Sequence, residues 1–244
     1  MSIQRGGHTF SALRVPIRTS GHKSGKSHAV LIGTKEKPKL IMIKIDYYIS
    51  HGSPWTFLGH NRLGTIVERY DAKLNILPVN YGDIFPISGG LPVTKRPPQR
   101  QKMRLQELER WSKFLKIKLI PQPKFFPSKS LLPSLVIIAS KLKDTKKEFI
   151  LANLIMNALW VEELDVDDEK VLTVLISKTG LDPDEIILFA KGTECREMFD
   201  LYTKNAIKND VFGAPTFIIE DQIYWGQDRL DFVERHLKEL TKTQ

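Results

Sequence analysis

Hydrophobic and polar side chains alternate along residues 43–50, a pattern typical of a half-buried β-strand. The chain then turns at His51-Gly52 and continues with Ser53-Pro54. Serine caps helices well and proline suits the first helical position, so this pair predicts the start of a helix. The helix extends to about Tyr70, and its apolar residues share one face: Trp55, Leu58, Leu63, Ile66, Val67 and Tyr70.

A second strand is predicted from Leu74 to Val79, and the C-terminal region has the pattern of a β-hairpin. There, two apolar runs at 217–219 and 223–225 flank a turn at 220–221. Gly226 ends the second run. A last helix opens at Gln227-Asp228 and reaches about Leu240, with Asp228 placed to cap N–H groups or to meet the ammonium group of a ligand.

The region between these parts has helical spacing interrupted by prolines. A Gly/Pro-rich loop is expected at 84–98, and a connector with four prolines follows the next helix. Asp165 is expected to begin a helix that Gly180 ends, and Asp182-Pro183 to begin the next. The predicted helices cover about 103–115, 134–142, 145–161, 165–180, 183 onward and 193–209.

Two short segments about 160 residues apart carry the candidate chemistry. Ser53 lies at a helix N-terminus, where exposed N–H groups and the helix dipole favour an anion such as a thiolate. Pro215 precedes a strand. Because proline cannot donate a hydrogen bond to a sheet, it is expected there only at an edge strand, at a strand start or in a cis turn. A cis bond would leave the Ala214 backbone free to pair with a peptide-like ligand. Ser53-Pro54 alone also fits an ordinary helix cap, but the pair indicates a thioredoxin-like site whose two redox thiols are replaced.

Residues 42–240 resemble the glutathione-dependent 2-hydroxychromene-2-carboxylate isomerases, relatives of the kappa-class glutathione transferases and of DsbA-type oxidoreductases. The matching stretches are 46–55, 57–59, 96–104, 109–111, 123–127, 158–160, 212–216 and 225–229. The resemblance implies an α/β class: a thioredoxin-like fold split by a large all-helical insertion. Its parts would be 42–84 with 210–244 as the thioredoxin-like domain, 85–209 as the insertion, and 1–41 as an extension.

The resemblance also implies a glutathione site and a mechanism. Ser53 would donate a hydrogen bond to the glutathione sulfur, and this thiolate would add to an unsaturated aromatic pyruvate and leave again after bond rotation. The implied glutathione contacts are Ala214, Pro215, Gln227 and Asp228. The candidates for binding a carboxylate of the substrate, or the glycine end of glutathione, are Lys95, Arg96, Arg100, Lys102 and Arg104. A solvated basic helix face explains any one of these five equally well.

Some positions depart from the family pattern. Ala214 replaces a common valine, and Lys95 stands where kappa-class enzymes have asparagine. Phe125, Phe126 and Trp160 fit either an aromatic-substrate pocket or ordinary core.

Two other functions fit the same residues. A kappa-like glutathione transferase would use the same thiolate but release the adduct. A non-catalytic thioredoxin-like binding module would need neither Ser53 nor the 227–229 segment. The expected partners are therefore glutathione and a small aromatic substrate, and the resemblance suggests a homodimer.

The net charge of +9 is concentrated at the N-terminus, where residues 1–41 have eight Lys or Arg and one acid. The remainder is nearly balanced, which argues against a nucleic-acid surface, and no apolar run is long enough to cross a membrane. The tail resembles a mitochondrial presequence in composition but lacks an amphipathic pattern. We favour a disordered or non-native extension before Met42, and a cytoplasmic protein.

Cys195 is the only cysteine, which excludes an intramolecular disulfide and a Cys-x-x-Cys couple. It is expected to be partly buried in a helix. The six histidines have no metal-binding spacing, so no metal is expected. His51 is of interest because it lies two residues before Ser53, although an exposed loop position is the expected one. Residues 21–27 resemble a phosphate-binding loop but have one residue too few between the glycines.

Overall fold

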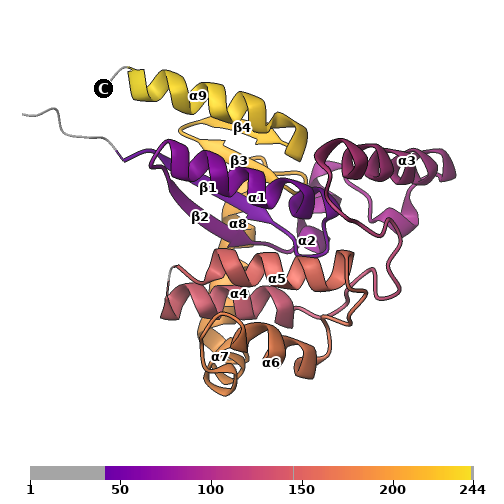
Figure 1. The fold of residues 1–244 in the computed structure, drawn as a ribbon, viewed down its shortest axis with the longest axis vertical. Helices are drawn as coiled ribbons and strands as arrows, with labels where there is room; N and C mark the ends of the chain where they lie inside the picture. Colours follow the sequence, from indigo (N-terminus) through magenta and orange to yellow (C-terminus); the bar gives the residue numbers. More distant parts are fainter. Residues whose placement is uncertain (1–41, 145, 243–244) are drawn as a thin grey trace, which may run out of the picture. The chain divides into compact units, whose positions relative to one another are not determined.

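The computed structural model describes residues 42–144 and 146–242, so the predicted extension 1–41 lies outside the described residues. A mixed sheet forms the centre, in the order β2-β1-β3-β4 (Figure 1). β1 pairs in parallel with β2 and antiparallel with β3, and β3 pairs antiparallel with β4. The strand bounds are Lys44–Ile49, Lys73–Pro78, Thr216–Ile219 and Gln222–Trp225.

The alternating pattern of β1 places Ile45, Tyr47 and Ile49 in the core, each fully buried. Tyr47 stacks on Phe217 of the neighbouring strand β3, with ring centroids 5.2 Å apart. Aromatic and β-branched residues on neighbouring strands stabilise a sheet through such contacts. Strands from the two ends of the chain therefore join in one core, and the predicted first strand, second strand and hairpin are confirmed.

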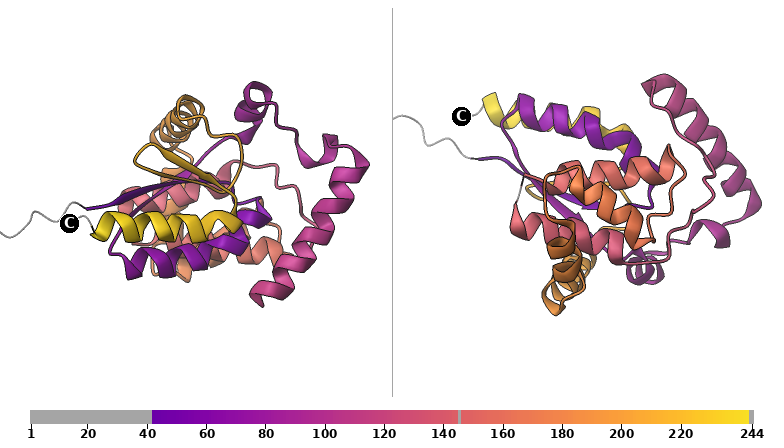
Figure 2. Two further views of the ribbon diagram at one scale, coloured as in Figure 1. Left: turned by 90° about the horizontal axis from the view of Figure 1, so that it is seen from above. Right: turned by 60° about the horizontal axis from the view of Figure 1, so that its bottom comes forward.

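Helices cover both faces of the sheet. α1 (Pro54–Arg69) and α9 (Leu230–Lys242) lie side by side along one face, and α8 (Thr193–Lys208) packs against β2 on the other (Figure 2). The 3₁₀ turn η2 (Gln227–Arg229) leads into α9. The helices predicted to start at Pro54 and at Thr193 are confirmed to within a residue or two.

The chain between β2 and β3 is mainly helical. Its elements are α2 (Tyr81–Ser88), η1 (Val93–Lys95), α3 (Pro98–Leu115), α4 (Leu132–Lys143), α5 (Glu148–Trp160), α6 (Glu169–Ser177) and α7 (Pro183–Ala190). α5 contacts α1, and α4 contacts β2, so these helices pack against the sheet domain rather than apart from it. The predicted α/β class with a helical insertion is confirmed.

Three local expectations were wrong. The expected loop at 84–98 contains the second half of α2, because the Asn80 side chain caps Gly82 N–H and Pro86 is tolerated in this short helix. The helix expected from Asp165 begins at Glu169, since Asp168 provides the cap and Asp165 accepts from Asp167 N–H in the preceding turn. Cys195, expected to be partly buried, is fully buried on α8.

Candidate functional site

Ser53 lies where β1 ends and α1 begins, in extended conformation with φ −96° and ψ 116°. Its Oγ accepts a hydrogen bond from Thr56 N–H at 3.2 Å, so it caps α1 as predicted. The same hydroxyl donates to the Ala214 carbonyl oxygen at 3.0 Å. The structure therefore brings together the two segments that the sequence singled out, at the positive end of a 16-residue helix.

The segment around Ala214 is held on both sides. The Tyr81 hydroxyl donates to Gly213 O at 2.8 Å, and Gly226 N–H donates to Pro215 O at 2.9 Å. The Ala214–Pro215 peptide bond is cis, one of the arrangements that the sequence predicted. Among the described residues nothing accepts a hydrogen bond from Ala214 N–H. A backbone donor beside the Ser53 hydroxyl thus stays available to a peptide-like ligand.

Gln227 and Asp228 follow directly after the Gly226 contact. Gln227 is buried against α1, where Arg62 donates to its side-chain oxygen at 3.1 Å and to its backbone oxygen at 3.3 Å. Asp228 is exposed and pairs with Arg229 at 3.0 Å. Gly226, not Asp228, occupies the cap position of η2. The carboxylate of Asp228 is therefore accessible for a ligand ammonium group.

Gly59 of α1 permits the close approach of Gln227. A Cβ at Gly59 would lie 2.9 Å from the Gln227 Cβ, so Gly59→Val should push η2 away from α1. At the glutathione site that the resemblance implies, we expect the affinity to fall about tenfold or more. Overpacking of about 1–3 kcal/mol should also lower the melting temperature by several degrees. Calorimetry and thermal unfolding measure the two effects.

Gly64→Val is the matched control for this prediction. A Cβ there would lie 2.8 Å from the Phe149 ring, and no atom of Gln227 is among its nearest neighbours. It should lower stability and leave glutathione affinity unchanged. Equal losses of affinity in the two variants would contradict a role for Gln227 and η2 in binding.

The predicted basic residues lie at the end of η1, just after it, and on the first turns of α3, and they differ in burial. Lys95 and Arg100 are exposed, while Arg96 is half-buried and donates from Nε to Leu91 O at 2.8 Å. Burial, and then Arg100, lower the pKa of Arg96. Arg104, one turn after Arg100, is only 7% exposed. Of the basic side chains named from the sequence, Arg104 is therefore the one that folding removes from water.

His51 was expected to be an exposed loop residue, and this was wrong. It is 8% exposed and joins the Ser53 loop to the helical insertion. Its Nε2 lies 2.8 Å from Ser128 Oγ, and its Nδ1 lies 3.0 Å from Ser134 Oγ. Ser128 in turn donates to Asp167 at 2.5 Å. These partners lie 77 to 116 positions away in the sequence, so no local pattern could have identified them.

The hydrogen-bond directions fix the tautomer of the neutral His51 ring. Because Ser128 uses its only proton on Asp167, the Nε2 of His51 must donate to Ser128 Oγ. The Nδ1 then accepts from Ser134. Burial lowers the pKa of His51 to about 4, although Asp167 acts in the opposite direction. His51 is therefore neutral near pH 7 and holds the Ser53 loop in place without adding charge to it.

Other features of the described residues lie apart from this site. Burial raises the pKa of Cys195 to about 11, which keeps its thiol protonated near neutral pH. No cluster of three or more metal-binding side chains occurs in the described part of the chain. Within 42–144 and 146–242, no helix has the length and apolarity needed to span a membrane.

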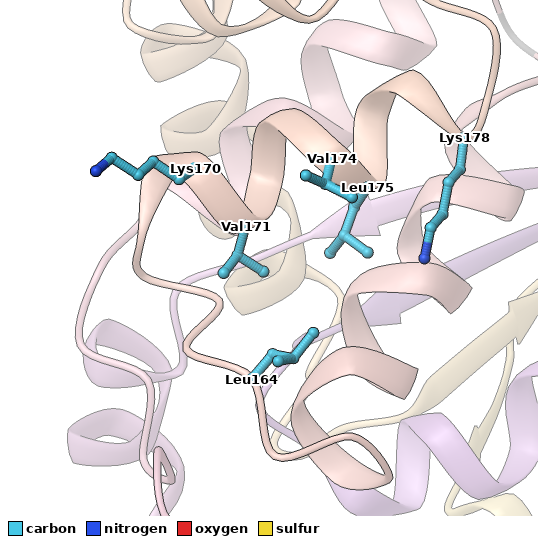
Figure 3. A pocket seen from close by; sticks show the side chains of 6 residues that line it. All are labelled: Leu164, Lys170, Val171, Val174, Leu175 and Lys178. Atoms are coloured by element: carbon cyan, nitrogen blue, oxygen red, sulfur yellow. The ribbon is translucent and has the colours of Figure 1, made fainter.

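A groove on the insertion also lies apart from Ser53. It runs along α6 and is lined by Leu164, Val171, Val174 and Leu175, with Lys170 and Lys178 beside it (Figure 3). It shares no residue with the segments around Ser53.

Residues 44–238 match the DsbA-like thioredoxin domain, and the chain belongs to this family. The 2-hydroxychromene-2-carboxylate isomerase of Sphingobium xenophagum is 26% identical over 194 residues, covering 79% of this chain and 97% of that protein. The enzyme of the same name from Pseudomonas putida is 24% identical over 199 residues, covering 81% and 96%. The resemblance stated from the sequence is confirmed.

Solved structures show the same fold. A 2-hydroxychromene-2-carboxylate isomerase superposes with a TM-score of 0.71 at 24% identity, over 82% of this chain and 97% of that one. The cytosolic disulfide reductase DsbM from Pseudomonas aeruginosa, solved with GSH, gives 0.57 at 16% identity, over 82% and 98%. The thioredoxin-like fold expected from the sequence is thus confirmed.

Proposed function

We propose that this protein is a glutathione-dependent isomerase of the 2-hydroxychromene-2-carboxylate isomerase type. The observation that carries the proposal is the Ser53 hydroxyl at the N-terminus of α1, 3.0 Å from the backbone oxygen of Ala214. A thiol donor that pairs with Ala214 would bring its sulfur to Ser53. The match with this chain spans nearly the whole length of the relatives named as isomerases, which supports the assignment.

The site has the parts needed to bind the cysteinyl unit of glutathione. The Ala214 N–H is free to donate, and Ala214 O now accepts the Ser53 proton. When the amide N–H of a bound cysteinyl unit replaces Ser53 at that oxygen, the hydroxyl becomes free to turn toward the sulfur. Binding thus releases the donor that the thiolate needs. That hydrogen bond and the N–H groups of α1 lower the thiol pKa.

The remaining contacts extend this proposal to both ends of glutathione. Gln227 and Asp228 would hold the γ-glutamyl end, with the exposed Asp228 carboxylate facing its ammonium group. Lys95, Arg96 and Arg100 form a basic surface that would attract carboxylates toward the site. In this proposal the sheet segments 42–84 and 210–244 bind glutathione, and the insertion 85–209 contributes the side facing the substrate.

The thiolate would act as a reversible nucleophile. It adds to the unsaturated side chain of an aromatic pyruvate, the former double bond rotates as a single bond, and the sulfur leaves with its electron pair. No oxidant is consumed and glutathione is regenerated. The absence of a second thiol near Ser53 suits this chemistry, since Cys195 is the only cysteine and lies buried on α8.

The test is isomerisation of 2-hydroxychromene-2-carboxylate, followed by absorbance, with glutathione or with S-methylglutathione. We expect turnover with glutathione and none with the methylated form, which has no thiol to ionise. Equal turnover without any thiol would contradict the mechanism. Conjugation of chlorodinitrobenzene without isomerisation would replace the isomerase with a kappa-like transferase, and failure of both assays would leave a binding module.

A further inference from the structure

The buried guanidinium of Arg104 has no anionic partner. Among the described residues no carboxylate lies within 4.0 Å of it, and its Nη2 makes no hydrogen bond. The side chain lies against two aromatic rings, with Cζ 5.2 Å from the Phe126 centroid and 6.0 Å from that of Trp160. Stacking on rings offsets part of the cost of burying the charge, but an unpaired buried cation remains unfavourable.

A second unpaired donor belongs to the same cluster. Trp160 is fully buried at the end of α5, and its Nε1–H has no acceptor. Its ring lies 5.0 Å from that of Phe126. Buried donors normally find acceptors, so two orphan donors around one ring indicate that the acceptor is supplied from outside the chain.

Neighbouring charges strengthen the preference for an anion. Burial, and then Arg96, lower the pKa of Arg104 to about 10, which still leaves it charged at neutral pH. Arg100 likewise contributes to lowering the pKa of Arg96, after burial. Arg96, which precedes α3, and Arg100 and Arg104 on α3 thus repel one another, and an anion between them would relieve this repulsion.

The cluster lies next to the Ser53 loop. Phe126 is two residues before Ser128, whose hydroxyl binds His51, and His51 is two residues before Ser53. α3 and α5 both contact α1, and α3 lies at the end of the sheet where β1 ends and α1 begins (Figure 1). The Arg104 cluster is therefore joined to the Ser53 segment through Ser128 and His51.

We propose that Arg104, with Trp160 Nε1–H, binds the carboxylate of a planar aromatic acid whose ring packs against Phe126. Arginine suits a carboxylate because its N–H groups can donate two parallel hydrogen bonds. The choice of an aromatic acid rests on the proposed function, whereas the need for an anion follows from Arg104 itself. The same chemistry would also accept the glycine carboxylate of glutathione, and the test separates the two.

The test is a calorimetric titration with 2-naphthoate and with its uncharged analogue 2-naphthamide. We expect wild-type protein to bind the naphthoate in preference to the amide. Arg104→Met should weaken naphthoate binding by about tenfold to a hundredfold, the loss of a charge-assisted hydrogen bond. Trp160→Phe should weaken it less. Glutathione titrations of the same proteins should show no change.

Arg110→Met is the matched control, because Arg110 lies on the same helix and pairs with Glu107 at the surface. It should bind naphthoate as the wild type does. Arg104→Met should melt at or above the wild-type temperature, since it removes an unpaired buried charge. Arg104→Lys keeps the charge without the paired donors and should bind with intermediate affinity.

Two results would overturn the proposal: naphthoate affinity unchanged in Arg104→Met, or naphthamide bound as tightly as naphthoate. Loss of glutathione affinity in Arg104→Met, with naphthoate unaffected, would assign the carboxylate to glutathione instead of the aromatic acid. If wild-type protein binds naphthoate through Arg104 but never binds glutathione, the anion site stands while the proposed function falls.

Discussion

Ser53→Ala should raise the thiol pKa of bound glutathione by about one to two units, because a hydrogen bond to a charged group contributes about 1.5–3 kcal/mol. Below that pKa the isomerisation rate should fall about tenfold to a hundredfold. The variant also loses the hydrogen bond to Thr56 N–H, which costs about 1 kcal/mol of stability. Rates and thiolate absorbance, each measured across pH, give the two quantities.

The control must separate a lost thiolate donor from a lost helix cap. Asp168→Ala removes the cap of α6, where Asp168 accepts from Lys170 N–H, and should cost similar stability with no change in thiol pKa. Ser53→Thr restores a hydroxyl and should recover most of the rate. A wild-type thiol pKa in Ser53→Ala would show that Ser53 serves only as a cap.

Unfolding free energy should fall by about 3 kcal/mol between pH 7.5 and pH 5.5, because two buried histidines resist protonation. Burial lowers the pKa of His51 and of His60 to about 4, against an unfolded value of about 6.5. The unfolded chain therefore binds protons that the folded chain does not, and this stability is present above pH 6.5 and lost as pH falls toward 4. A loss of about 3 kcal/mol is large because the whole unfolding free energy of a typical protein is only about 5–15 kcal/mol.

Urea unfolding at several pH values measures this effect, and the slope gives the number of protons taken up on unfolding. We expect it to approach two near pH 5.5. His51→Gln should reduce it by about one, since the amide can replace both hydrogen bonds but cannot ionise. Burial raises the pKa of Glu148, so protonation of this carboxyl favours the folded state at lower pH and opposes the effect of the histidines. The measured pH range therefore ends at 5.5. A flat profile from 7.5 to 5.5 would contradict the burial of both rings.

Local sequence signals predicted the parts of the fold that local physics determines. Ser53 and Pro54 mark the start of α1, Asp182 and Pro183 mark that of α7, and the run around 217–225 defines a hairpin. The start of α6 was placed too early because Asp165 and Asp168 are both acceptable caps, and only the turn at Asp167 decides between them.

The sequence could not show which polar residues folding buries. His51 looked like a loop residue because Ser128, Ser134 and Asp167 meet it only in three dimensions. Arg104 stood among five basic candidates, and only its burial against Phe126 and Trp160 distinguishes it. Contacts between elements far apart in the sequence determine the burial of His51 and of Arg104. The hydrophobic periodicity along one element carries no information about such contacts.

The most direct measurement is the thiol pKa of glutathione bound to the wild-type protein, followed by thiolate absorbance in the ultraviolet during a pH titration at saturating protein. We predict ionisation well below the value of about 8.5 for a free cysteine thiol, because the N-terminus of α1 and the Ser53 hydroxyl would both stabilise the thiolate. Ionisation at about 8.5, or no binding at millimolar glutathione, would contradict a site built to activate this thiol.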